Sequence, residues 1–209
     1  MKYPIRILAV IAVVCATLLG SASSVSTATT ATTASDNGDN DNGDLIRWDL
    51  IRLNPHTLIA LPGGAASAQD PATGETVRIT GSGQFDADDE TASGGGTFVS
   101  RDADGSLVER GVFVVSDFIS WQPLAGSIVD TPIIDGVAEK PDARSGIVTL
   151  DIAGYVRGEL IGHATLEVHC ALPGAPAGSF EGVTVEVEGG PKFTTMVDHG
   201  PTIFHVLDD

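Results

Sequence analysis

Residues 77–85 read VRITGSGQF, and this stretch decides the fold. Val77, Ile79 and Phe85 lie at alternate positions, and Gly81 and Gly83 continue the same series between them. The intervening residues, Arg78, Thr80, Ser82 and Gln84, are all polar. A period of two is typical of a β-strand that has one buried and one solvated face.

The same alternation recurs along the chain, at residues 148–157 and 183–188. Further strands are predicted at 46–53, 97–100, 108–120, 160–170 and 202–207, and turn signals such as Asp-Gly and Pro-Gly separate the runs. No window of comparable length places apolar residues at helical spacing. The sequence therefore predicts an all-β domain over residues 45–209.

Two features favour a closed sheet. Residues 111–115, GVFVV, are apolar at every position, so we expect both faces of this strand to be covered. Glycines crowd two neighbouring strands, at residues 81–83 and 94–96, where the missing side chains permit sharp coiling or the close approach of another backbone. The prediction is a single antiparallel β-barrel of about eight strands, and a β-sandwich is the alternative.

The two glycine-rich segments also resemble each other: TGSGQF at 80–85 and TASGGGTF at 91–98, followed by a turn at Asp104-Gly105. Over about residues 77–115 this combination resembles a group of small secreted all-β proteins of unestablished function, whose shape is similar to the calycin-like barrels. The resemblance implies a barrel and implies no particular activity.

The N-terminus predicts export. Lys2 and Arg6 precede an apolar run at residues 7–19, and the small residues at 20–23 follow it, which is the pattern of a cleaved signal peptide. We assign residues 1–22 to the signal peptide. Residues 23–44 are rich in Ser, Thr, Asp and Asn, and are predicted to be a disordered linker. The mature protein is expected to be secreted, without stable insertion in a membrane.

Charge and cysteine content limit the partners and the chemistry that the sequence supports. The chain has 11 Lys and Arg against 28 Asp and Glu, a formal charge of −17, which disfavours binding to nucleic acid. Loss of the leader removes Cys15, so that Cys170 has no intramolecular partner for a disulfide. We expect Cys170 to be a small buried apolar residue rather than a nucleophile.

One strand carries the best candidate for acid–base chemistry. In residues 160–170 the apolar positions are expected to share one face: Leu160, Ala164, Leu166, Val168 and Cys170. His163, Thr165, Glu167 and His169 then lie on the other. Residues two apart on a strand are separated by about 6.6 Å, so Glu167 and His169 can form a pair that His163 cannot join. An outward, solvated pair is the favoured interpretation.

A second, weaker set is Asp198-His199 with His205, and His205 is interpreted as a hydrogen-bonded core residue. Trp48, Phe113, Val115 and Trp121 are the candidate ligand-binding residues, with simple core filling as the alternative. The Asp-rich run at 36–44 lacks the spacing of a calcium loop, so no metal and no cofactor is predicted.

The function predicted from these observations is a binding or surface-interaction module, whose partner is a small apolar molecule or a component of an extracellular surface. One alternative is a barrel enzyme of the isomerase or cyclase type that uses Glu167 and His169. The other is an extracellular structural protein.

Overall fold

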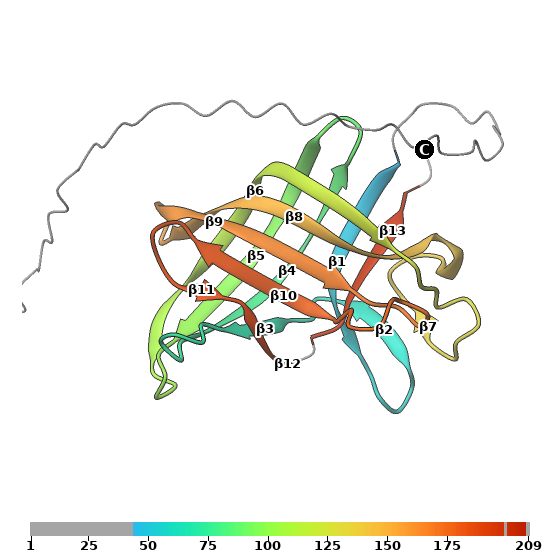
Figure 1. Ribbon diagram of the computed structural model, residues 1–209, viewed down its shortest axis with the longest axis horizontal. Coiled ribbons are helices and arrows are strands. Elements are labelled where there is room, and N and C mark those ends of the chain that lie inside the picture. The colour runs from blue at the N-terminus through green and yellow to red at the C-terminus, as the bar shows by residue number, and fades with distance from the viewer. Residues whose placement is uncertain (1–43, 199, 208–209) are drawn as a thin grey trace, which may run out of the picture. The chain divides into compact units, whose positions relative to one another are not determined.

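The computed structural model describes residues 44–198 and 200–207. The predicted signal peptide and linker (apart from Asp44), together with His199, lie outside the described residues. Within them, the chain is all-β (Figure 1), and the one helical element is a 3-10 turn at Lys140–Asp142. None of the described residues belongs to a helix of the length and apolarity needed to span a bilayer.

Eight strands have five or more residues: β1 (Leu45–Leu53), β4 (Thr76–Asp86), β5 (Thr91–Arg101), β6 (Leu107–Leu124), β8 (Ala143–Val156), β9 (Glu159–Cys170), β10 (Gly182–Val187) and β13 (Thr202–Val206). Each of them overlaps a strand predicted from the alternation. Five shorter strands complete the sheet: β2 (Ile59–Pro62), β3 (Ala66–Gln69), β7 (Ile134–Asp135), β11 (Lys192–Phe193) and β12 (Thr195–Asp198).

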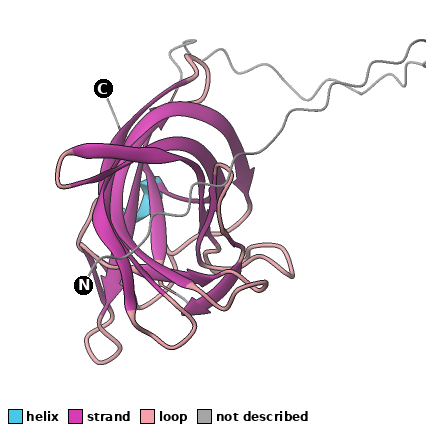
Figure 2. Cartoon of the chain, turned by 90° about the vertical axis from the view of Figure 1, so that its left-hand side faces the viewer, coloured by secondary structure: helices cyan, strands magenta, loops and turns pink. Residues whose placement is uncertain are grey.

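Antiparallel pairing links most neighbouring strands, in the order β11-β10-β9-β8-β6-β5-β4-β1. β13 pairs with β1 on one side and with β8 on the other, and β3 pairs with both β4 and β12. Figure 2 shows the strands curving strongly as they cross the domain. The pairing of β6 with β8 shifts register at two places, and such bulges allow a long strand to bend.

The tight turn predicted between β5 and β6 is present. The N–H of Gly105 donates to the carbonyl of Asp102 at 2.9 Å, and Gly105 has φ of +82°. That conformation is easily accessible only to glycine, which explains why Asp104 is followed by this residue.

The glycine-rich part of the hairpin pairs with itself: Gly81 lies opposite Gly96, and Gly83 opposite Gly94. The strand predicted at residues 97–100 is longer in the structure, where β5 begins at Thr91. Without side chains, this part of the sheet leaves space above it, and the indole of Trp48 and the ring of Phe113 pack there. The expected close approach of another backbone is made by the paired strands themselves, and two aromatic side chains also lie against these glycines.

The expectation that β6 is covered on both faces is wrong for the described residues. Phe113 is buried in the core, whereas Val112 is 50% exposed and Val114 is 44% exposed on the outer face. The neighbours of Val112 in the sheet are Thr97 on β5 and Tyr155 on β8, and no described segment crosses over them. An apolar sequence thus marks a strand whose outer face meets solvent.

Candidate functional site

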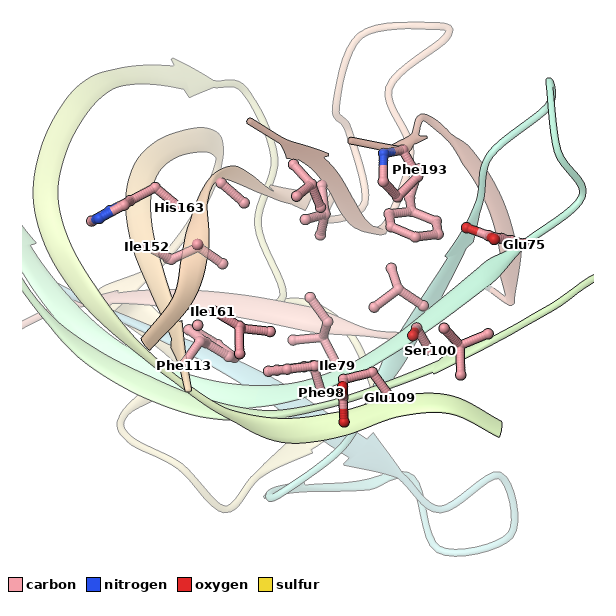
Figure 3. A pocket seen from close by; sticks show the side chains of 18 residues that line it. Glu75, Ile79, Phe98, Ser100, Glu109, Phe113, Ile152, Ile161, His163 and Phe193 are labelled. Atoms are coloured by element: carbon pink, nitrogen blue, oxygen red, sulfur yellow. The ribbon is translucent and has the colours of Figure 1, made fainter. Parts of the chain in front are cut away.

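An apolar cavity of about 280 Å³ lies between two walls of the sheet. β4, β5 and β6 form one wall, and β8, β9, β10 and β11 form the other. Its main apolar lining residues are Val77, Ile79, Phe98, Phe113, Ile152 and Phe193. Figure 3 shows these side chains converging from both walls onto a common space. A cavity of this size approaches the lower range of small-molecule sites.

Strand alternation and register place these residues on one face. Ile79 lies opposite Phe98, and Phe98 lies opposite Gly111 on the next strand. Phe113 lies between Gly96 and Gly154, its partners on the two neighbouring strands. The ring of Phe113 points into the interior, where it lies against Gly81 and forms part of the cavity lining; a β-carbon on Gly81 would meet the ring at 3.0 Å.

Of the four candidate ligand-binding residues, the structure places only Phe113 on this cavity. Trp48 is completely buried among core residues. Trp121 packs against Phe85 and Phe204, with ring centroids 5.1 and 4.8 Å apart. Val115 is half-buried and packs on the core. Aromatic side chains therefore fill one part of the interior, and the cavity occupies another.

Trp48 also leaves one polar atom unsatisfied. Its Nε1–H is buried and has no hydrogen-bond partner among the described residues. A β-carbon on Gly83 would lie only 2.7 Å from this nitrogen, which shows how closely the indole lies against the strand. An unpaired buried donor destabilises the fold by itself, so the position of the Trp48 indole is determined by packing and not by a hydrogen bond.

Two carboxylates that sequence reasoning missed also line the cavity. Glu109 lies opposite Ser100, which in turn lies opposite Val77, so the three residues share the face that meets the cavity. Glu75 precedes β4 by one residue and lines the same space. The sequence does contain a signal for Glu75, because residues 75, 77 and 79 form one series of alternate positions and are therefore expected to share a face. The prediction did not extend this series beyond Val77.

Glu167 and His169 are brought together as their spacing predicted. Oε2 of Glu167 lies 3.1 Å from Nε2 of His169 and accepts a hydrogen bond from Oγ1 of Thr184 at 2.9 Å. The ring of Phe180 covers the imidazole, with centroids 4.4 Å apart. Burial lowers the pKa of His169, and the neighbouring Glu167 partly offsets that effect.

This pair is separate from the cavity. Leu166 and Val168 point into the core from the same strand, so Glu167 and His169 face the opposite side, and neither lines the cavity. His163 does line it, from the end of the cavity away from Glu75 (Figure 3). The solvated position expected for the pair is found for Glu167, whose side chain is 41% exposed, but not for His169, whose side chain is only 7% exposed beneath Phe180.

Leu160 is an exception to the predicted apolar face. The pairing between β8 and β9 shifts register beside Tyr155, so that Gly154 lies opposite Gly162 and Tyr155 opposite Leu160. This irregularity reverses the alternation before Gly162, and Leu160 is 53% exposed. Single-residue shifts of this kind leave no mark in a pattern of apolar and polar residues.

Cys170 is a free, buried thiol, as expected. Its Sγ donates to the carbonyl of Thr202 at 3.4 Å, beside the carboxylate of Glu181. Burial, followed by the nearby Glu181, raises the pKa of Cys170 well above its usual value. Glu181 itself accepts hydrogen bonds from the backbone N–H groups of Ala171 and Thr202, both at 2.9 Å. The cluster joins three segments, and its thiol is held in the unreactive protonated form.

His205 is a hydrogen-bonded core residue, in agreement with the sequence interpretation. Its Nε2 lies 2.8 Å from Oδ2 of Asp135, and both side chains are buried. Asp198 contacts a different strand, where its Oδ2 accepts from Oγ of Ser67 at 2.8 Å. The two members of the weaker predicted set that the structure describes thus lie in separate contacts. Among residues 44–198 and 200–207, no three His, Cys, Asp or Glu side chains gather as a metal site requires.

No protein-family model, curated protein or solved structure matches this chain. The resemblance to calycin-like secreted proteins therefore stays a prediction. Any functional conclusion depends on the geometry of the cavity and its surroundings.

Proposed function

We propose that this protein is a secreted binding module whose strands form a β-barrel that holds a small apolar ligand in the cavity beside Phe113. The single observation that carries the proposal is an apolar cavity whose lining excludes both Glu167 and His169. A barrel enzyme using that pair needs it to face the bound substrate, and a purely structural protein has no need of an internal space.

Strand pairing supports the barrel. Successive pairings lead from β8 through β6, β5, β4, β1 and β13 and back to β8. Around the cavity, β10 contacts β3 and β12, and the backbone N–H of Lys192 donates to Oδ2 of Asp70 at 3.2 Å. Because β3 pairs with β4, a second and wider circuit runs through β4, β5, β6, β8, β9, β10, β12 and β3 around the cavity. This circuit favours an enclosure of about eight strands, the number inferred from the sequence.

The lining supports an apolar ligand. Ile79 and Phe113 are almost inaccessible to solvent, yet both border an open space. Apolar surface that lacks packing partners loses dispersion contacts, and a ligand of matching shape restores them. Burial of the ligand's own apolar surface adds about 25 cal/mol per Å² removed from water.

Titration with an apolar fluorescent probe tests the proposal. We expect saturable binding to the native protein with about one site per chain. Gly154→Val fills part of the cavity, because a β-carbon at Gly154 meets its nearest neighbour, Ile161, at 3.5 Å, an ordinary contact. This variant is expected to fold and to lose the probe.

Ile152→Ala and Leu150→Ala provide a matched pair on β8. Both residues are buried, but only Ile152 lines the cavity. Enlarging the cavity with Ile152→Ala should change probe affinity, while Leu150→Ala should lower stability alone, by about 2–5 kcal/mol. If native protein shows no saturable binding, or if both variants alter affinity equally, the binding function is refuted.

Secretion is proposed from the charged start, apolar run and small residues of the N-terminus. Mass spectrometry of culture medium should find a mature N-terminus between about residues 20 and 30. A chain that begins at Met1 and stays with the cells would contradict this part of the proposal.

A further inference from the structure

The polar groups on the cavity are strongly biased towards negative charge. Glu75 and Glu109 both line it, and each is half-buried beside apolar neighbours. Glu109 shares its face with Ser100 through the register of β5 and β6. Figure 3 shows Glu75, Ser100 and Glu109 along the same wall, and His163 at the far side from Glu75.

Neither carboxylate has a cationic partner within the described residues, where the ion pairs involve other acidic groups. The side chain of Glu109 accepts one hydrogen bond, from the backbone N–H of Arg110 at 3.2 Å. Lys192, whose strand borders the cavity, instead pairs with Glu186 at 2.6 Å. The negative charge at the cavity is therefore not neutralised by the protein's own side chains.

Given the proposed binding function, on which this inference rests, we infer that the ligand class is a cationic amphiphile, an apolar chain or ring carrying an amine. The apolar lining accepts the hydrophobic part. Glu75 and Glu109 accept hydrogen bonds from the ammonium group at the polar edge of the cavity, where contacts of opposite charge are strengthened by the low-polarity surroundings.

The same arrangement disfavours an anionic amphiphile of the fatty-acid type. Its carboxylate would lie beside Glu75 and Glu109, no lysine or arginine lines the cavity to receive it, and like charges at short distance repel. The formal charge of −17 on the whole chain acts in the same direction, because it attracts cations and repels anions at longer range.

Three probes that share one apolar tail separate these possibilities: octylamine, octanol and octanoate, each measured at neutral pH by displacement of the apolar fluorescent probe. We expect octylamine to bind at least about tenfold more tightly than octanoate, with octanol between them. Raising the salt concentration should reduce the advantage of the amine.

The double variant Glu75→Gln/Glu109→Gln removes both charges and keeps the size of the side chains. It should bring octylamine to the affinity of octanol and strengthen octanoate. The control is Asp88→Asn/Asp89→Asn, which removes the same charge from the exposed turn after β4 and should leave the order of affinities unchanged.

Equal binding of the three probes, tighter binding of octanoate, or an amine preference that survives the Gln variant would overturn this inference while the binding function stands. Failure of all three probes, and of the fluorescent probe itself, would refute the binding function as well.

Discussion

The indole of Trp48 lies directly against the backbone of Gly83, so closely that a β-carbon at position 83 would come within 2.7 Å of Nε1. Trp48 is fully buried on β1, and the two residues lie opposite each other in the pairing of β1 with β4. The glycine-rich strand thus provides the space for the largest side chain of the core. This contact explains why residues 77–85 contain glycines at alternate positions.

Gly83→Ala should therefore destabilise the protein by about 1–3 kcal/mol, because the added methyl would meet both the backbone carbonyl of Ser93 and the indole of Trp48. Gly154→Ala is the matched control on another core strand. Its β-carbon meets its nearest neighbour at 3.5 Å, so it should be neutral or slightly stabilising. Urea unfolding followed by tryptophan fluorescence measures both, and equal stability of the two variants would show that the close packing around Gly83 has no energetic importance.

The eight longer strands could be predicted because each is long enough for the alternation of apolar and polar residues to repeat. The short strands could not. β7 and β11 have two residues each, too few for any periodicity, and they form because neighbouring segments offer backbone partners. The irregularity near Leu160 was hidden for a similar reason, since pairing register depends on the partner strand.

The site was only partly predictable. Phe113 was identified from its apolar surroundings, but Ile152 and Phe193 reach the cavity from strands distant in the sequence. Trp48 and Trp121 were candidates because aromatic residues are common in binding sites, yet both are needed to fill the core. Which aromatic residue packs and which borders a space depends on three-dimensional register, and the composition of a strand does not reveal it.

Cys170 should react with a thiol reagent only when the protein unfolds. Burial and the raised pKa together remove the thiolate that such reagents attack. Peptide mapping after labelling distinguishes Cys170 from Cys15 where both are present. Rapid modification of Cys170 in native protein would contradict its burial. The midpoint of thermal unfolding should also be unaffected by reductant, since we predict no disulfide.

Stability should decrease in mild acid because of His169. Its pKa in the folded protein lies below the ordinary value of 6.5, so the unfolded chain takes up a proton at higher pH than the folded chain does. The free energy of unfolding therefore falls as the pH decreases through about 6.5, and is regained as the pH rises. Urea unfolding at a series of pH values between about 5 and 8 measures this change in the free energy of unfolding.

His169→Gln should weaken this dependence. The exposed His163 lies on the same strand, so His163→Gln is the control and should retain the wild-type profile. If both variants follow the wild-type curve, another group causes the acid sensitivity.

Asp135→Ala should cost about 3 kcal/mol or more. The change leaves Nε2 of His205 buried without a partner, and it also removes the acceptor of the backbone N–H of Val137 at 2.9 Å. Asp130→Asn, at an exposed position in the same connection, should change stability by less than about 0.5 kcal/mol. A loss at Asp135 no larger than that of the control would mean that the pair with His205 contributes little.

A titration with octanol followed by methyl NMR tests most directly whether the cavity beside Phe113 binds an apolar ligand. We expect saturable shifts for the methyl groups of Ile79, Ile152 and Val185, which line the cavity. Ile128, equally buried but away from it, should remain unchanged. Shifts confined to the exposed Val112 and Val114, or no saturable shift at any methyl group, would contradict it.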